Sequence, residues 1–205
     1  MKVPTPKRRT QAERREVAES RLLRAAVDLL SERGYDGFSV AEVGERAGYS
    51  RGIVAHYFSS KDELLSLTAK YVVENYAVSL AHLPATEPGL PRLAAIIRNH
   101  ARVANNKASR ALGVLLTEAT LRPSLKKTIA ELNRRGHTTL RAELAAGVAA
   151  GNISSKIDLD VSARVIFTFI RCQMSFALLD RTYDQEMVAD DFIATLSQGL
   201  CATRR

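Results

Sequence analysis

The chain has 205 residues, of which 46% are hydrophobic and 25% are charged, as is usual for a globular protein of one or two domains. This composition excludes a chain that is disordered throughout, a collagen-like repeat and a disulfide-stapled miniprotein. The net charge of +8 favours polyanionic partners, with nucleic acid foremost among them.

The first twelve residues, 1–12, are rich in Pro, Lys and Arg and are expected to form a disordered basic arm. Such an arm either enters a DNA minor groove beside a recognition helix or remains a solvated tail, and the sequence leaves both open. From about Glu13 to Arg33, apolar residues recur every three or four positions, which predicts a helix that Gly34 ends.

Two short helices with a tight turn between them are predicted next, over residues 40–47 and about 51–57. Ser39 followed three residues later by Glu42 has the pattern of a capping box at the start of the first helix. Gly48 can supply the positive φ that the turn needs. A supporting helix, a short turn and a second helix together make a helix-turn-helix, whose second helix enters the major groove of DNA.

Several side chains of this segment are candidates for DNA contacts. Arg51 can donate two hydrogen bonds to guanine, and Gly52 lets the helix approach DNA closely. The helix starts near Ser39 and Ser50 offer amides to phosphates. The complete set of candidate DNA-binding residues is Ser39, Val40, Ser50, Arg51, Gly52, His56, Tyr57 and Lys61.

The remaining chain also has a helical period. Ser60 and Glu63 form a second capping-box pattern before a long helix over 61–81, and the clearest linker lies at 84–91. Further helices are predicted over 92–105, 108–121, 123–150, 160–179 and 185–200. Because no convincing strand or repeat occurs, we expect an all-α fold of about nine helices: an N-terminal three-helix helix-turn-helix DNA-binding domain plus a larger C-terminal helical bundle.

Four runs of sequence carry a resemblance to a known family: Ala25–Leu30, Gly34–Val40, Ala47–Gly52 and Tyr57–Leu65. With these runs, residues 21 to 65 resemble the DNA-binding domain of the TetR family of bacterial regulators. The resemblance implies a DNA-binding domain at 13–62. It also implies a C-terminal domain at 63–205 that binds a small-molecule effector and carries the dimer interface.

Two positions depart from the family pattern. Gly44 stands where the family commonly has alanine, which costs helix propensity and eases packing. Ala55 stands where the family often has an aromatic residue that touches the DNA backbone. Weight therefore shifts to His56, Tyr57 and Lys61 as the phosphate contacts of this chain.

The family resemblance also implies that the last two helices pair with their copies in a homodimer. Val161, Val165 and Phe176 belong to more apolar material than one exposed helix face would carry, although intramolecular core explains such residues equally well. A dimer would place two recognition helices about one DNA turn apart. We therefore expect double-stranded DNA with a palindromic operator as the partner.

Polar residues on otherwise apolar helices are the candidates for effector contacts. They are His100, Thr117, Glu118, His137 and Arg171, although such residues are more often at the surface or satisfied in the core. Arg171 follows the apolar run 165–170 and can either pair with an acid or meet an anionic effector. The sequence does not identify the effector.

Enzymatic signals are missing from the sequence. The histidines are widely spaced, and no HExxH, Walker glycine loop or GxSxG occurs, so no catalytic residue, metal or cofactor is expected. Cys172 and Cys201 form no CxxC and are interpreted as small core residues. Because no apolar run of about 18 residues occurs, and none follows the basic start, we expect a cytoplasmic protein with no membrane span.

The function predicted from the sequence is a sequence-specific DNA-binding transcription regulator, a repressor that a small-molecule effector releases from its operator. The alternative is a regulator or architectural DNA-binding protein with no small-molecule effector. More than 100 residues follow the linker, which favours a sensing domain.

Overall fold

The computed structural model describes residues 10–180 and 182–201. Within them the chain forms nine helices, and an isolated antiparallel bridge joins Ile153 to Cys201. The all-α prediction is confirmed. The helices are α1 (Gln11–Arg33), α2 (Val40–Ala47), α3 (Arg51–Tyr57), α4 (Lys61–Ala81), α5 (Leu90–Val103), α6 (Lys107–Glu118), α7 (Pro123–Ala149), α8 (Leu159–Leu179) and α9 (Gln185–Leu200).

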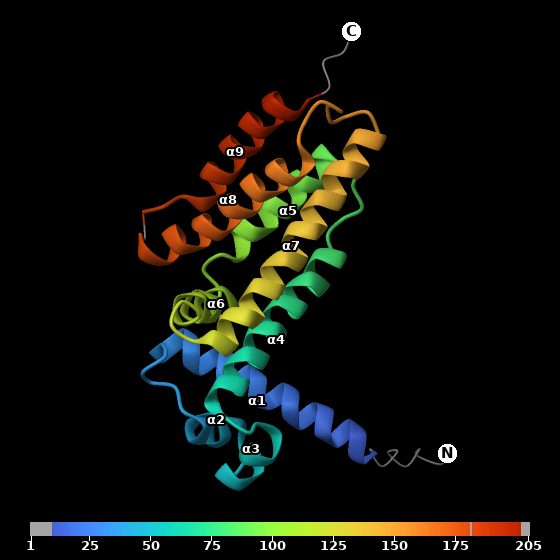
Figure 1. Ribbon diagram of the computed structural model, residues 1–205. Helices are drawn as coiled ribbons and strands as arrows, with labels where there is room; N and C mark the ends of the chain where they lie inside the picture. Colours follow the sequence, from blue (N-terminus) through green and yellow to red (C-terminus); the bar gives the residue numbers. More distant parts are fainter. Residues whose placement is uncertain (1–9, 181, 202–205) are drawn as a thin grey trace, which may run out of the picture.

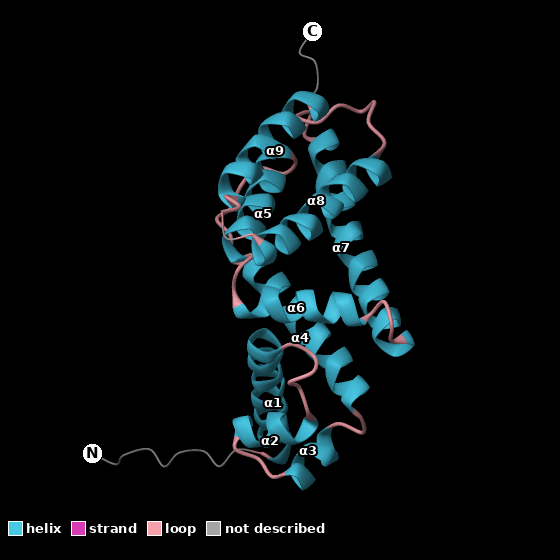
Figure 2. Cartoon of the chain, turned by 90° about the vertical axis from the view of Figure 1, so that its left-hand side faces the viewer, coloured by secondary structure: helices cyan, strands magenta, loops and turns pink. Residues whose placement is uncertain are grey.

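The helices are arranged along one long axis. Figure 1 shows α1, α2 and α3 at one end of the molecule, and α8 and α9 toward the other. The long helices α4 and α7 run between these ends. In the perpendicular view, α6 crosses the molecule between α1 and the helices of the far end (Figure 2). This layout separates the helix-turn-helix from the C-terminal bundle.

The first helix begins two residues earlier than the sequence predicted. The Thr10 hydroxyl accepts a hydrogen bond from the Glu13 amide at 3.2 Å, and the Glu13 carboxylate accepts one from the Thr10 amide at 2.8 Å. This reciprocal capping box starts the helix at Gln11. The predicted arm 1–12 was therefore too long at its end, and residues 1–9 lie outside the described residues.

The capping box predicted for α2 is only half formed. The Ser39 hydroxyl accepts from the Glu42 amide at 3.2 Å, as expected. The Glu42 carboxylate instead accepts from the Ser39 hydroxyl at 2.8 Å and pairs with Arg33 at 3.0 Å. Ser60 caps α4 through its own hydroxyl, which accepts from the Glu63 amide at 3.1 Å. One orphan amide per helix is thus satisfied at these two starts.

Two apolar cores hold the chain together. The first core contains residues of α1, α2, α3 and the first turns of α4, which pack on α6 and on the start of α7. Leu64 and Leu65 of α4 are completely buried in it. The second lies among α5, α7, α8 and α9. Because the first turns of α4 belong to the first core, the core that holds α1, α2 and α3 extends beyond residue 62. The domain boundary at that residue stays a prediction.

Helix α8 differs from what the sequence analysis expected. By length and composition it is apolar enough to cross a membrane, with a mean hydropathy of 1.3 over its most apolar window. The helix is this apolar because one face, with Ala163 and Ile166, is buried in the second core while Val161 and Val165 on another face are uncovered. Two apolar faces on one helix raise its mean hydropathy without a continuous apolar run.

The close approach of α2 to α3 depends on Gly44. A Cβ at this position would lie 2.6 Å from Val54 Cγ2 and 3.0 Å from the Tyr49 carbonyl oxygen, so the two helices meet where a side chain is missing. Val54 is itself completely buried. This explains the glycine at a position where the related family commonly has alanine.

We expect Gly44→Ala to destabilise the protein despite its better helix propensity. The gain of about 1 kcal/mol in propensity is outweighed by an overpacking cost of about 1 to 3 kcal/mol. Urea unfolding followed by circular dichroism at fixed protein concentration measures the difference. Gly52→Ala is the control, because no atom lies within 4 Å of a Cβ there, and it should gain about 1 kcal/mol. A Gly44→Ala protein as stable as Gly52→Ala would contradict this account.

Candidate DNA-binding surface and effector cavity

The turn between α2 and α3 has the geometry of a helix-turn-helix. Gly48 ends α2 in the left-handed conformation, with φ 78° and ψ 28°, as the sequence predicted. The Tyr49 amide then donates to the Gly44 carbonyl at 2.8 Å, which closes the turn. Val43 and Val54 are completely buried between the helices and the rest of the first core. The turn therefore holds α3 at the end of the molecule with one face packed and one face outward (Figure 1).

The outward face of α3 carries the residues predicted to read DNA. Arg51, Gly52 and His56 are exposed, and the Arg51 side chain forms no ion pair or hydrogen bond with any other described residue. Ile53 is 43% exposed beside them. The sequence analysis missed Ile53, which lies about 100° around the helix from the inward-facing Val54 and leaves the packed face. An apolar contact of this kind suits the methyl group of thymine.

The N-cap residues of α2 and α3 differ in whether their hydroxyl groups already form a hydrogen bond within the protein. The Ser39 hydroxyl caps α2, and the Val40 side chain packs against the first core. Neither side chain is therefore well placed to contact DNA. Ser50 occupies the N-cap position of α3, but its hydroxyl caps no amide, and it is exposed. Of the three, Ser50 has the free hydroxyl that a phosphate contact requires.

Tyr57 and Lys61 are engaged within the protein. Tyr57 packs partly buried against the first core, and the guanidinium carbon of Arg15 lies 5.9 Å from its ring centre. The Lys61 ammonium lies 3.8 Å from the ring centre of Tyr35 and donates to the carbonyl oxygen of that residue at 3.4 Å. Lys61 keeps two further N–H donors, so it remains a candidate phosphate contact held in place by Tyr35.

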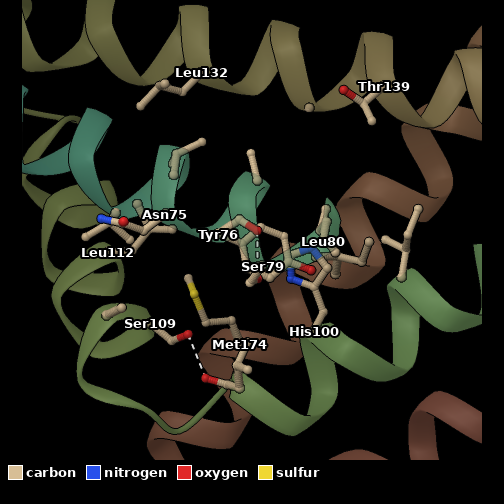
Figure 3. Close-up of a pocket in the computed structure, with 18 of the residues that line it drawn as sticks. Asn75, Tyr76, Ser79, Leu80, His100, Ser109, Leu112, Leu132, Thr139 and Met174 are labelled. Carbon is tan, nitrogen blue, oxygen red and sulfur yellow. Dashed lines mark hydrogen bonds between the residues drawn. The ribbon is translucent and has the colours of Figure 1, made fainter. Parts of the chain in front are cut away.

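A cavity of about 570 Å³ lies among α4, α5, α6, α7 and α8. Apolar side chains of all five helices make up most of its wall, and Figure 3 shows Leu112, Leu132 and Met174 facing it from three of them. Its volume lies within the usual range of small-molecule sites. Among the predicted effector contacts, His100 and Arg171 line it.

The other three predicted effector residues lie elsewhere. Thr117 is exposed, and its hydroxyl donates to the backbone of its own helix. Glu118 forms an ion pair with Arg122 at 3.1 Å. His137 is bonded to the Asp160 carbonyl oxygen at 3.1 Å. The structure does not bring them to the cavity, because each lies on a face of its helix that points away from it.

Tyr76 and His100 lie next to each other in the cavity wall and bring polar groups to it (Figure 3). Their ring centres are 4.2 Å apart with an angle of 39° between the planes. The buried Asn99 amide donates to the Tyr76 hydroxyl at 3.3 Å and accepts from Arg102 at 2.8 Å. The sequence analysis missed Tyr76 and Asn99, because only the packing of α4 on α5 brings them to His100.

Burial keeps this aromatic pair neutral. Loss of solvent, with a smaller contribution from the nearby Arg171 charge, lowers the pKa of His100 from 6.5 to about 3. Burial also raises the pKa of the Tyr76 hydroxyl above its usual value. At neutral pH both rings therefore act as uncharged hydrogen-bonding and stacking groups.

Arg171 brings a permanent charge to the same wall. Burial lowers its pKa from 12.5 to about 10, so the guanidinium stays protonated at neutral pH. Nη2 donates to Asn133 Oδ1 at 3.0 Å, and the guanidinium carbon lies 4.9 Å from the Phe167 ring centre. Nε is buried and has no hydrogen-bond partner among the described residues.

Helices α7 and α8 meet closely beside the cavity. A Cβ at Gly136 of α7 would lie 2.6 Å from the Phe167 ring of α8. Gly136 and Phe167 both line the cavity. The cavity wall is therefore closely packed where α7 meets α8.

Polar contacts tie the cavity helices to the DNA-binding end. Lys107 opens α6 and donates to Asp28 at 2.8 Å and to Glu32 at 3.2 Å, both on α1. Glu32 also pairs with Arg46 of α2 at 2.6 Å, and the bonds from Arg46 and Lys107 lower the pKa of its carboxyl. The start of α6, next to the cavity, is thus linked to both α1 and α2.

A second junction lies at the start of α7. The guanidinium carbon of Arg122 is 4.1 Å from the Tyr35 ring centre, and Arg122 approaches Asp62 of α4 at 3.7 Å. Tyr35 also carries the Lys61 ammonium on its ring. One arginine therefore connects α7, α4 and the turn before α2.

The outer face of α8 is apolar and uncovered. Val161, Val165 and Phe176 are exposed at helical spacing, and the exposed Cys172 lies between the last two. The interpretation of Cys172 as a core residue was wrong, because it occupies this outer face, and Cys201 is exposed as well. On the inner side, Phe169 stacks on Phe192 of α9 at 3.7 Å between ring centres. The apolar residues of α8 thus serve both a core and an open surface.

No group of three His, Cys, Asp or Glu side chains that could hold a metal ion occurs within residues 10–180 and 182–201.

Comparison with known proteins identifies the family. The model of the bacterial regulatory proteins of the tetR family matches residues 22–67, and a tetracyclin repressor-like C-terminal domain matches residues 86–173. These matches cover both the helix-turn-helix and most of the cavity helices. The chain belongs to the TetR family of bacterial regulators, and it is a helix-turn-helix, DNA-binding transcription regulator, as the sequence predicted.

Individual relatives differ in how much of the chain they match. The regulator CymR of Pseudomonas putida is 47% identical over 70 residues, which is 34% of each chain. The regulator BetI of Burkholderia mallei is 30% identical over 159 residues, covering 70% of this chain and 80% of its own. The structure of FadR from Bacillus subtilis in complex with stearoyl-CoA superposes with a TM-score of 0.73 at 19% identity, over 87% of this chain and 97% of that one.

We expect His100 to make the protein sensitive to acid. Because its pKa is lowered on folding, the unfolded chain takes up a proton that the folded chain refuses, and stability is lost as the pH falls below 6.5 toward 3. Between pH 7 and pH 5 this loss is about 2 kcal/mol. Urea unfolding at the two pH values should show the loss in the wild type and a correspondingly smaller one in His100→Gln.

His56, His82 and His137 are present in both proteins, so their contributions cancel in this comparison. An equal loss of stability in the wild type and in His100→Gln would show that His100 is protonated in the folded state.

Proposed function

We propose that this regulator is a homodimeric repressor that binds a palindromic DNA operator and leaves it when a small-molecule effector occupies the cavity. The observation that carries the proposal is the position of α3 at one end of the molecule, with Arg51, Gly52 and His56 exposed and the Arg51 side chain unpaired among the described residues. A separate cavity lies among the helices that adjoin this end. The cavity favours the effector-controlled regulator over one without an effector.

The proposed DNA contacts fall into base contacts and phosphate contacts, according to which side chains are exposed and unpaired. Arg51 is the base reader, because its guanidinium is exposed and unpaired among the described residues, and Gly52 allows close approach. Ser50, His56 and Lys61 are assigned to phosphates. The +8 charge of the chain adds a salt-dependent attraction that does not depend on sequence.

The dimer is assigned to α8 and α9. Val161, Val165 and Phe176 leave an apolar surface on α8 that two copies can cover mutually, as an isologous interface requires. Met187 of α9 is exposed as well and is a further apolar residue available to the interface. A two-fold axis there would point both α3 helices toward successive major grooves, which matches a palindromic operator.

The effector is assigned to the cavity because its walls lead to the DNA-binding end. Helix α4 carries Tyr76 in the cavity wall and starts directly after the helix-turn-helix. Helix α6 lines the cavity and holds α1 through Lys107, and Glu32 of α1 pairs in turn with Arg46 of α2. An effector that shifts α4 or α6 would change the spacing of the two α3 helices, with a coupling of about 1 to 3 kcal/mol. We place this regulator in the cytoplasm and assign it no enzymatic reaction.

We expect Arg51→Ala to weaken specific operator binding by about 1 to 3 kcal/mol. The operator would first be selected from random-sequence DNA duplexes, and affinities then measured by gel shift for the selected site and for unrelated DNA at the same salt concentration. Arg134→Ala is the matched control, because it removes the same charge from an exposed position on α7.

Two results would count against this assignment. If Arg51→Ala weakens binding to all DNA alike, Arg51 is a phosphate contact. If no symmetric sequence is selected, the palindromic operator is wrong.

We expect Val165→Glu to dissociate the dimer. A carboxylate buried without a partner in an apolar interface costs about 2 to 4 kcal/mol, which weakens the dimer about 100-fold. Analytical ultracentrifugation over a concentration series gives the dissociation constant. Val78→Glu is a matched control on α4, since Val78 is 57% exposed and Val165 is 52% exposed. Dissociation of the Val78 variant, or of neither, would place the interface elsewhere.

A further inference from the structure

The Arg171 guanidinium is a buried cation without a matching anion. None of the ion pairs formed by the described residues includes it, and its one hydrogen bond there goes to the neutral amide of Asn133. A guanidinium has five N–H donors, so most of them remain unused. Proteins bury charge where it is paired, and an unpaired buried charge is costly. An anion from outside the described chain would supply the missing partner.

The neighbours of Arg171 do not supply this anion. Tyr76 stays protonated, since burial raises its pKa, and His100 stays neutral, since burial lowers its pKa to about 3. The other charged residues that line the cavity are Glu74, Arg92, Arg135 and Glu143, whose charges cancel. With Arg171 included, the lining therefore has a net positive charge. Of these, Arg92 donates to the Leu80 carbonyl oxygen at 2.9 Å.

The rest of the cavity fits an apolar body. Leu112, Leu132 and Met174 face the space from α6, α7 and α8, as Figure 3 shows. The Tyr76 and His100 rings add an aromatic wall next to them. At the density of liquid water, 570 Å³ corresponds to about 19 water molecules, so the space admits a ligand of moderate size.

The type of anion follows from the single guanidinium. A carboxylate carries one negative charge and can accept two parallel hydrogen bonds from one arginine. A phosphate monoester carries a charge of about −1.5 to −2 at neutral pH and would need further cations at the same place. One buried arginine within an apolar wall therefore matches a monocarboxylate.

We propose that the effector is an apolar monocarboxylate, whose carboxylate pairs with the Arg171 guanidinium while its hydrocarbon or aromatic body lies between the Tyr76–His100 pair and Leu132. This assignment rests on the proposed function, in which the cavity is the effector site. It also accounts for the unsatisfied Nε of Arg171.

Titration calorimetry without DNA tests the assignment. The probes are octanoate and 4-phenylbutanoate, each compared with its primary amide, which has the same shape and no charge. The wild type should bind at least one acid about 10- to 100-fold more tightly than the corresponding amide, as expected for a charge-assisted hydrogen-bond pair. Arg171→Met should lose this preference while it keeps its affinity for the amide.

Two further variants make the result specific to Arg171. Arg134→Met, on the exposed side of α7, should keep the full preference for the acid. Arg171→Lys keeps the charge without the paired donors and should show an intermediate preference, and it replaces Arg171→Met if that variant does not fold. Equal binding of acid and amide by the wild type, a preference that survives in Arg171→Met, or binding of neither acid would overturn the assignment.

Release of the selected operator by the same compounds separates this inference from the proposed function. Amides that bind as well as the acids and release the operator would leave the effector function standing and the carboxylate assignment wrong. Acids that bind through Arg171 without releasing the operator would leave the site standing and the proposed control of DNA binding wrong.

Discussion

Helix α4 is buried in two places, and the link between the cavity and the DNA-binding end depends on this. Its first turns, with Leu64 and Leu65, complete the core on which α1, α2 and α3 pack. Its later turns carry Tyr76 into the cavity wall. A helix is a rigid element over this length, so a displacement at Tyr76 would be carried to the first turns of α4, which pack on the helix-turn-helix.

The ion pairs between α6 and the N-terminal helices work alongside this packing. Lys107, Asp28 and Glu32 are at least partly exposed, and exposed pairs contribute little to stability. These ion pairs position the start of α6 against α1, whereas the apolar core supplies most of the stability. Coupling between the two ends thus rests on a strong apolar contact and a weak, adjustable polar one.

The helices could be predicted from the sequence because glycine, proline and cap residues mark nearly every end, as Gly34, Gly48 and Pro123 do. Whether a cap residue forms one hydrogen bond or two depends on competing partners, and Arg33 draws the Glu42 carboxylate away from the predicted box. Of the effector candidates, His100 and Arg171 were distinguishable from Thr117, Glu118 and His137 only by the faces on which helices pack. Tyr76 looked like an ordinary core aromatic until α5 placed His100 against it.

The contact between Gly136 and Phe167 restricts how the cavity can adapt to its contents. Helices α7 and α8 touch there without room for a single methyl group, so no part of a guest fits between them at this contact in their resting positions. A guest bulkier than the resting space has to displace a helix of the cavity wall, and among these helices α4 and α6 contact the N-terminal helices. If the cavity is the effector site, guest size and regulatory response would be linked, because only a compound that displaces α4 or α6 would act on the N-terminal helices.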